Sequence, residues 1–175
     1  MNRLIAGMAV VASLATAGWA STGSAEIRGT ATNSPIRGTA TFEDTPGGLH
    51  VTAQVISVPA GAHGFHIHEY GACDAMAKAA GGHYNPMNVN HGDVLKAGLQ
   101  HAHAGDLGNF TAAADGSGRV DVTIPGLTLA GGSSPVAGRS VVLHEKVDDL
   151  TSQPAGNAGN RIACGSILVT GVGTK

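Results

Sequence analysis

The chain has 175 residues, a formal net charge of −2 and a charged fraction of only 13%. Because it has no basic cluster and no row of aromatic side chains, the sequence excludes the usual binding surfaces for nucleic acid. Glycine is abundant, with 27 residues, and apolar residues alternate with polar ones in short runs separated by Gly, Pro, Asn and Asp. This composition and pattern indicate an all-β protein.

The N-terminal segment is typical of a secretory signal. Arg3 is followed by an uncharged, mostly apolar run over residues 4–20, as in a signal peptide. A membrane-spanning helix is the alternative, but the most apolar stretch, residues 4–17, is shorter than the roughly 20 residues that a bilayer requires. We therefore predict export and removal of this segment.

Small-residue patterns would allow cleavage after Ala17, Ala20 or Ala25. We favour Ala25, and so a signal peptide over residues 1–25, because sequence typical of a strand begins there. The mature chain, residues 26–175, is long enough for one domain and short for two. No cysteine lies near these positions, so we expect no lipid attachment and no membrane anchor after cleavage.

Three runs alternate apolar and polar residues as half-buried strands do, and they cover residues 36–42, 50–58 and 119–124. The second run changes parity after Val55, which predicts a β-bulge. Residues 115–118, Asp-Gly-Ser-Gly, are a hairpin-turn signal directly before the third run. A helical turn is indicated only within residues 74–80.

Two stretches do not fit strands. Residues 71–109 contain most of the histidines, and residues 145–160 are rich in Gly, Asn, Pro and Asp. Several short strands in close succession favour a β-sandwich or a flattened barrel. Long segments on such a scaffold commonly carry function, so we predict two long functional loops.

The histidines are the most informative residues, and the chain has nine. His66 and His68 lie two residues apart in a strand-like run, so both imidazoles leave the same face. Such a pair alone is as often solvated or bonded within a core as it is a pair of metal ligands. More potential ligands follow, and they favour a metal site: His83, His91, His101, His103, Asp106 and His144.

The two cysteines of the chain, Cys73 and Cys164, are expected to pair in an exported protein. The bridge would close a loop of about 90 residues and stabilise the fold by roughly 4.5 kcal/mol on the chain-entropy model. Two free buried thiols are the alternative.

Six separated motifs together resemble one family, the copper/zinc superoxide dismutases, and the resemblance covers nearly all of the mature chain. The motifs are HGFHIHEYG, GGHYNPMNVNHG, HAGDLGNFTA, ADGSGRVDV, VVLHEKVDDL and GNAGNRIACG. The segment TSQPAGNAGNRIACG is most similar to the bacterial secreted branch, which implies a periplasmic protein. The fold implied is an immunoglobulin-like Greek-key β-sandwich, or flattened eight-stranded barrel.

The resemblance implies one copper and one zinc ion per subunit, with one imidazolate, that of His83, bridging them. The copper ligands would be His66, His68, His83 and His144, and the zinc ligands His83, His91, His103 and Asp106. His103 is preferred to His101 because it alone lies three residues before Asp106, as the family's HxxD spacing requires. The closed set of three histidines and one aspartate suits structural zinc.

Two further residues match functional positions of the family. Asp148 matches a carboxylate that links a copper ligand to a zinc ligand, here His66 and His91, and a solvated loop acid is the alternative. Arg161 matches the residue that guides the anionic substrate, because a guanidinium stays charged at any working pH. A surface salt bridge is the alternative for Arg161. His50 and His63 are interpreted as a surface strand residue and a hydrogen-bonded loop residue.

The implied reaction converts two superoxide anions and two protons into dioxygen and hydrogen peroxide. His83 is expected to release copper and take up a proton in the first half-reaction and to return it in the second. A secreted copper/zinc-binding or metal-delivery protein without turnover is the alternative from another class. Such relatives usually lack a copper ligand or the arginine, whereas this chain has both. A copper-only dismutase is a further alternative, and the presence of the predicted zinc residues argues against it.

Removal of residues 1–25 leaves nine basic and twelve acidic residues, a net charge of about −3. An anionic substrate must therefore be attracted by local charges, and Arg161, Lys146 and the metals are the candidates. Compared with animal cytosolic members, the segments after His68 and His144 are shorter and that after His91 is longer. The sequence therefore leaves a monomer and a homodimer both open.

Overall fold

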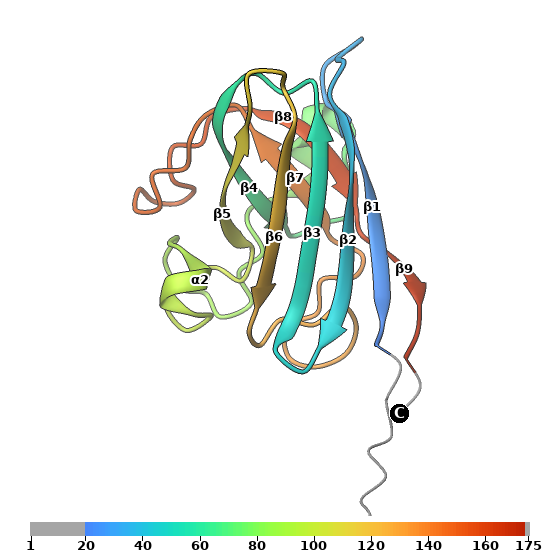
Figure 1. Ribbon diagram of the computed structural model, residues 1–175. Helices are drawn as coiled ribbons and strands as arrows, with labels where there is room; N and C mark the ends of the chain where they lie inside the picture. Colours follow the sequence, from blue (N-terminus) through green and yellow to red (C-terminus); the bar gives the residue numbers. More distant parts are fainter. Residues whose placement is uncertain (1–19, 174–175) are drawn as a thin grey trace, which may run out of the picture.

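The computed structural model describes residues 20–173, which form nine strands and three short helical turns (Figure 1). The strands are β1 (Thr22–Gly29), β2 (Arg37–Thr45), β3 (Gly48–Ile56), β4 (Gly61–His68), β5 (Asp106–Ala112), β6 (Gly118–Ile124), β7 (Ser140–His144), β8 (Arg161–Ser166) and β9 (Leu168–Gly171). The turns are α1 (Asp74–Ala77), η1 (Lys78–Ala80) and α2 (Val94–Ala97). The predicted all-β class is confirmed. No helix within residues 20–173 has the length and apolar character to cross a membrane.

Eight strands close into a barrel. They are hydrogen-bonded in the order β2-β3-β6-β5-β4-β7-β8-β1, and β1 pairs back with β2. Because β3 lies beside β6 and β4 beside β7, the long connections cross in the Greek-key manner. The predicted eight-stranded Greek-key barrel is confirmed. The short strand β9 adds to β1 as an extra strand.

Alternation along the strands builds the interior of the barrel. In β3, Leu49, Val51, Ala53 and Val55 are buried, and the residues that alternate with them face outward. Phe42 and Phe65 from other strands fill the same core. The predicted hairpin turn before β6 is also present, with Ala112 paired to Gly118 across it.

The β-bulge predicted within residues 50–58 is wrong. Strand β3 pairs in continuous register with both β2 and β6. The strand ends at Ile56, Ser57 has a left-handed φ of 61°, and Val58 turns back into the core with 3% of its surface exposed. A turn at the end of a strand therefore changes parity just as a bulge would.

A bulge occurs instead between β4 and β5. The register between these strands shifts between Gly64 and His66, and Gly108 in β5 has a positive φ of 84°. Strand β5 begins at Asp106, so the predicted loop over residues 71–109 ends earlier than expected. The sequence did not indicate this strand because the bulge interrupts the alternation of its residues. The shifted register places Asp106 directly opposite His66.

Strands β4 and β7 are buried on both faces over most of their length. Their inner faces line the barrel, and their outer faces are covered by the two long loops, residues 69–105 and 145–160. In Figure 1 the second loop and the part of the first loop that contains α2 project on the side of the barrel where β4 and β5 lie. The prediction of two long loops is thus confirmed, and a polar site between wall and loops is protected from solvent.

Cys73 and Cys164 form the predicted disulfide, across a sequence separation of 91 residues. It joins the start of α1 to β8. The helical turn predicted within residues 74–80 is present, but Ala75 and Met76 have φ values of 52° and 56°. The turn α1 is therefore left-handed, a conformation that non-glycine residues rarely adopt in succession.

The predicted cleavage after Ala25 falls inside β1. Ala25 pairs with Ala40 and is 1% exposed. The strand begins at Thr22, so the reason for preferring Ala25 to Ala20 does not hold. The predicted signal peptide lies mainly in residues 1–19, outside the described part of the chain.

Candidate metal centre

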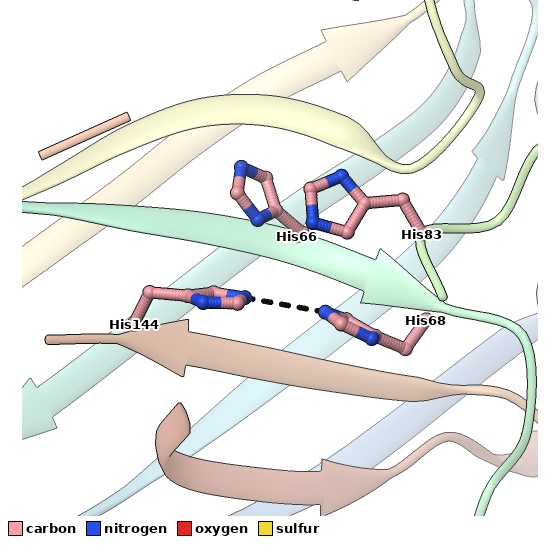
Figure 2. A group of neighbouring side chains, drawn as sticks. All are labelled: His66, His68, His83 and His144. Atoms are coloured by element: carbon pink, nitrogen blue, oxygen red, sulfur yellow. Dashed lines mark hydrogen bonds between the residues drawn. The ribbon is translucent and has the colours of Figure 1, made fainter. Parts of the chain in front are cut away.

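One set of histidines stands on the outer face of the barrel wall. His66 and His68 leave the same face of β4, as predicted, while Phe65 and Ile67, which alternate with them, point into the core. His144 ends the neighbouring strand β7. His83 comes from the first loop and makes a single β-bridge to His68. Figure 2 shows the four rings gathered around one point.

Hydrogen bonds define which ring nitrogens face that point. His68 Nδ1 donates to Gly81 O over 3.1 Å, and His144 Nδ1 donates to Gly159 O over 3.3 Å. Each neutral ring then keeps a lone pair on Nε2. The two Nε2 atoms are 3.2 Å apart (Figure 2). Two lone pairs at this distance repel one another unless a cation lies between them.

His66 and His83 complete this set. His66 Nε2 donates to Asp148 Oδ2 over 2.7 Å, so its Nδ1 is the free nitrogen. Both His66 Nδ1 and His83 Nε2 are buried without a hydrogen-bond partner in the described chain. Buried polar atoms rarely lack a partner. Four convergent imidazole nitrogens are a donor set that suits copper, so the residues fit the ion.

A second set surrounds the Asp106 carboxylate. Its oxygens lie 2.7 Å from His83 Nδ1, 3.0 Å from His91 Nδ1 and 3.2 Å from His103 Nδ1. The Nδ1 atoms of His91 and His103 are buried and make no hydrogen bond to any residue in the 20–173 range. Three imidazoles and one carboxylate within 4.8 Å of one another are a closed set for tetrahedral zinc.

The two sets share His83 and are also joined by Asp148. The carboxylate of Asp148 accepts from His66 Nε2 over 2.7 Å and from His91 Nε2 over 2.9 Å. A Cβ atom at Gly156 would lie 1.7 Å from Asp148 Oδ1, so only glycine fits there. The structure thus places Asp148 between one histidine of each set. Such contacts fix the tautomer and direction of ligating imidazoles.

Burial lowers the pKa values of histidines in the first set, whereas neighbouring carboxylates raise the pKa of His91 in the second set. Burial, reinforced by neighbouring histidines, lowers the pKa of His83 to about 4 and that of His144 to about 3, and it also lowers the pKa of His68. Burial opposes the charged form of His91 too, but the carboxylates of Asp106 and Asp148 outweigh it and raise the pKa of His91 to about 9.

The pKa values of the two carboxyl groups shift downward. Burial alone would raise the pKa of Asp106 and of Asp148, but close contacts with the surrounding histidines lower both pKa values below the usual range. The second set therefore carries one stable negative charge, on Asp106, and Asp148 adds another beside it. Both charges favour a divalent cation.

Arg161 lies at the opening of the centre. Its guanidinium donates to Ala77 O and Gly81 O in the disulfide-bonded segment. A pocket of about 450 Å³ leads from the surface to His68 and His144 and has Arg161, Pro154 and Ala155 in its wall. A small anion that enters this pocket therefore approaches both a positive charge and the free nitrogens.

The remaining histidines lie outside both sets. His101 is exposed, and His103 occupies the second set, as the spacing predicted. His50 is a surface strand residue that bonds Asp121 over 2.9 Å. His63 is hydrogen-bonded as predicted, to Pro59 O and His144 O, but it lies in β4 and not in a loop.

Sequence reasoning missed three side-chain amides that support the loops. Each bonds both backbone groups of one residue: Asn85 those of Val89, Asn109 those of Asp148, and Gln153 those of His91. Asparagine and glutamine in irregular segments are too common to be distinguished in a sequence by this role.

A family model described as copper/zinc superoxide dismutase matches residues 36–167. The chain belongs to the copper/zinc superoxide dismutase family. It is an oxidoreductase that dismutates superoxide and binds one copper and one zinc ion. Both donor sets are complete in the described chain and Arg161 is present, so nothing there favours the non-catalytic alternative.

Relatives and solved structures agree with this membership. The chain is 36% identical over 147 residues to the extracellular superoxide dismutase [Cu-Zn] of Brugia pahangi, covering 79% of this chain and 72% of that protein. It is 40% identical over 139 residues to the superoxide dismutase [Cu-Zn] of Deinococcus radiodurans, covering 74% and 76%. The crystal structure of the clock protein EA4 matches with a TM-score of 0.74 and 34% identity over 86% of this chain and 95% of that one.

Proposed function

We propose that this dismutase holds copper with the first set, His66, His68, His83 and His144, and zinc with the second, His83, His91, His103 and Asp106. The observation that supports this most strongly is the pattern of free nitrogens. His66 Nδ1 and His83 Nε2 in the first set, and the Nδ1 atoms of His91 and His103 in the second, are buried without hydrogen-bond partners among residues 20–173. His83 also offers its Nδ1, which bonds Asp106, to the second set. When bound, copper supplies one-electron redox chemistry and zinc supplies a fixed positive charge.

His83 is proposed to move the proton. Its Nδ1 faces Asp106 in the zinc set, while its Nε2 faces the copper set. Nε2 can hold a proton after the first superoxide is oxidised to dioxygen and can donate it to the second as peroxide forms. Two superoxide anions and two protons thus become dioxygen and hydrogen peroxide. His83 Nδ1 and Asp106 would both bind zinc, so the ring would keep its orientation throughout.

Arg161 is proposed to bind and orient the anion. The two backbone carbonyls that hold its guanidinium fix it at the pocket wall. Lys146 is the candidate for a second positive charge, because the stem of its side chain passes Gly159, which lines the same pocket, although the Glu145 carboxylate lies beside Gly159 as well. Local charges of this kind attract an anion even where the whole protein is negative.

We also propose that the protein is secreted to a bacterial periplasm. The N-terminal segment has the signal-peptide pattern, a relative of similar sequence carries the word extracellular in its name, and another comes from a bacterium. Because β1 begins at Thr22, cleavage after Ala20 would leave the strand intact. N-terminal sequencing of the exported protein should find Ser21, and Glu26 would contradict this site.

Light scattering of that protein distinguishes monomer from homodimer.

Metal content and superoxide dismutation of the exported protein test the residue assignments together. The unchanged protein should contain copper and zinc in equal amounts and be active. Arg161→Ala should keep both metals and lose rate. If it keeps the full rate at low ionic strength, the substrate-guiding role is wrong.

A further inference from the structure

The side chain of Gln153 makes a double hydrogen bond with the backbone of His91. Gln153 Oε1 accepts from His91 N over 2.8 Å, and Gln153 Nε2 donates to His91 O over 3.0 Å. The same Nε2 donates to Thr151 O over 3.1 Å within its own loop. This is the pattern of a β-bridge, with a carboxamide in place of the second strand.

His91 needs such support because it lies in a loop and not in a strand. His91 is only 4% exposed, so its backbone N–H and C=O require partners. The barrel supplies none to these two groups, and Gln153 supplies both. The ring is fixed separately, since Asp148 bonds Nε2 and Asp106 faces Nδ1. Backbone and ring together set the direction of the Nδ1 lone pair.

Gln153 is also adjacent to the wall of the substrate pocket. The next two residues, Pro154 and Ala155, line that pocket together with His103. The double hydrogen bond therefore joins the segment that forms the pocket wall to a residue of the zinc set. Asp148 makes the other link, at the beginning of the same loop.

We propose that Gln153 is a positioning residue that fixes the His91 backbone for zinc and holds the pocket wall against the zinc site. The inference rests on the proposed assignment of His91 as a zinc ligand. Gln153 touches neither substrate nor metal, so it acts only through His91 and through its own loop. Asn109 does the same for Asp148, which indicates that this centre uses carboxamides where its loops lack strand partners.

The first test is zinc release from the copper/zinc protein to an excess of chelator. Gln153→Ala should release zinc roughly 10 to 100 times faster, the usual effect of losing a group that orients a metal ligand. Gln153→Glu keeps the acceptor but loses the donor, so it should also release zinc faster. Gln100→Glu is the matched control, because Gln100 is an exposed loop glutamine without a side-chain hydrogen bond within residues 20–173; it should behave as the unchanged protein.

Hydrogen exchange separates positioning from general loosening. The His91 amide should lose protection in Gln153→Ala and keep it in Gln153→Glu, which retains the acceptor. Zinc binding should slow exchange at the Ala155 amide in the unchanged protein and no longer do so in Gln153→Ala. Cobalt(II) at the zinc site should show altered visible bands in both variants.

Zinc release within twofold of the unchanged protein in both variants, or equal protection of Ala155 by zinc in Gln153→Ala, would overturn the inference. His91→Ala separates this failure from failure of the zinc assignment. If His91→Ala still binds zinc tightly, the assignment is wrong and the role of Gln153 falls with it. If His91→Ala loses zinc and Gln153→Ala does not, only the role of Gln153 is wrong.

Discussion

The two halves of the metal centre are built differently. Three of the four copper-set residues stand on strands β4 and β7, whose inner faces are part of the barrel core. The zinc set takes three histidines from the loop before β5, and only Asp106 belongs to a strand. The copper half is therefore positioned by the fold, whereas the zinc half is positioned by carboxylates, carboxamides and the ion itself. His83 belongs to both, with a β-bridge to His68 and a hydrogen bond to Asp106.

Loss of a strand-held ligand should have the largest effect on activity. His144→Ala removes one of the four convergent nitrogens while the barrel core remains intact. We expect copper affinity and superoxide dismutation to fall by on the order of 100-fold or more, because even indirect partners of metal ligands are worth 10- to 100-fold. Copper content and activity measure this, with circular dichroism as the control for folding. Full activity after copper loading would show that the copper set is wrong.

Loss of the zinc carboxylate should affect stability more than copper binding. Asp106→Ala leaves His91 and His103 without the carboxylate that faces their Nδ1 atoms. Breaking a buried ionic contact costs roughly 3 kcal/mol, which corresponds to a decrease in melting temperature of about 10 °C for a domain of this size. Zinc analysis and thermal unfolding measure this. Unchanged zinc content in this variant would place the zinc elsewhere.

The two halves should also differ in their response to pH when metal-free protein is titrated. His91, with its pKa raised to about 9, is protonated at neutral pH, so zinc must displace a proton. Zinc affinity should therefore fall about tenfold for each unit of pH below 9. His83 and His144, with pKa values lowered to about 4 and 3, are already neutral. Copper affinity should thus change little between pH 6 and 9.

Competition with a chelator at several pH values measures both affinities. An equally steep decrease for copper would remove the distinction between the halves. The raised pKa of His91 also makes the stability of the metal-free fold depend on pH. A raised histidine pKa stabilises the folded chain below the ordinary value of 6.5, and this stabilisation is lost as pH rises through about 9.

Changes at Arg161 should have the smallest effect on the metals, because its guanidinium is bonded to backbone carbonyls and not to a ligand. Arg161→Ala should lower the rate about tenfold, within the range of electrostatic steering, and reduce its dependence on ionic strength. Arg161→Lys should retain part of the rate, since it keeps the charge but not the two-pronged contact. Activity measured against salt concentration tests this, and a salt dependence unchanged in Arg161→Ala would exclude steering by this residue.

The difference between the halves also explains what the sequence could predict. Alternation was readable in β3 and β6, which have one buried face, and it placed His66 and His68 on the same face of β4. Strand β5 was missed because the bulge near Gly108 interrupts its pattern. The disulfide followed from two cysteines in an exported chain. The ligand sets came from the family resemblance, because spacing along a loop does not define direction.

Other features depend on contacts that no local pattern contains. The parity change after Val55 is a turn in the structure, although a bulge gives the same pattern. The start of β1 at Thr22 is set by pairing with β2 and β9. The roles of Asn109 and Gln153 depend on which backbone groups the barrel leaves without partners.

The most direct test of two ligand sets sharing His83 is a crystal structure of the copper- and zinc-loaded protein with anomalous data collected at both absorption edges. We predict a copper peak among His66, His68, His83 and His144, and a separate zinc peak among His83, His91, His103 and Asp106. A single shared peak, or a zinc peak outside the second set, would contradict the account.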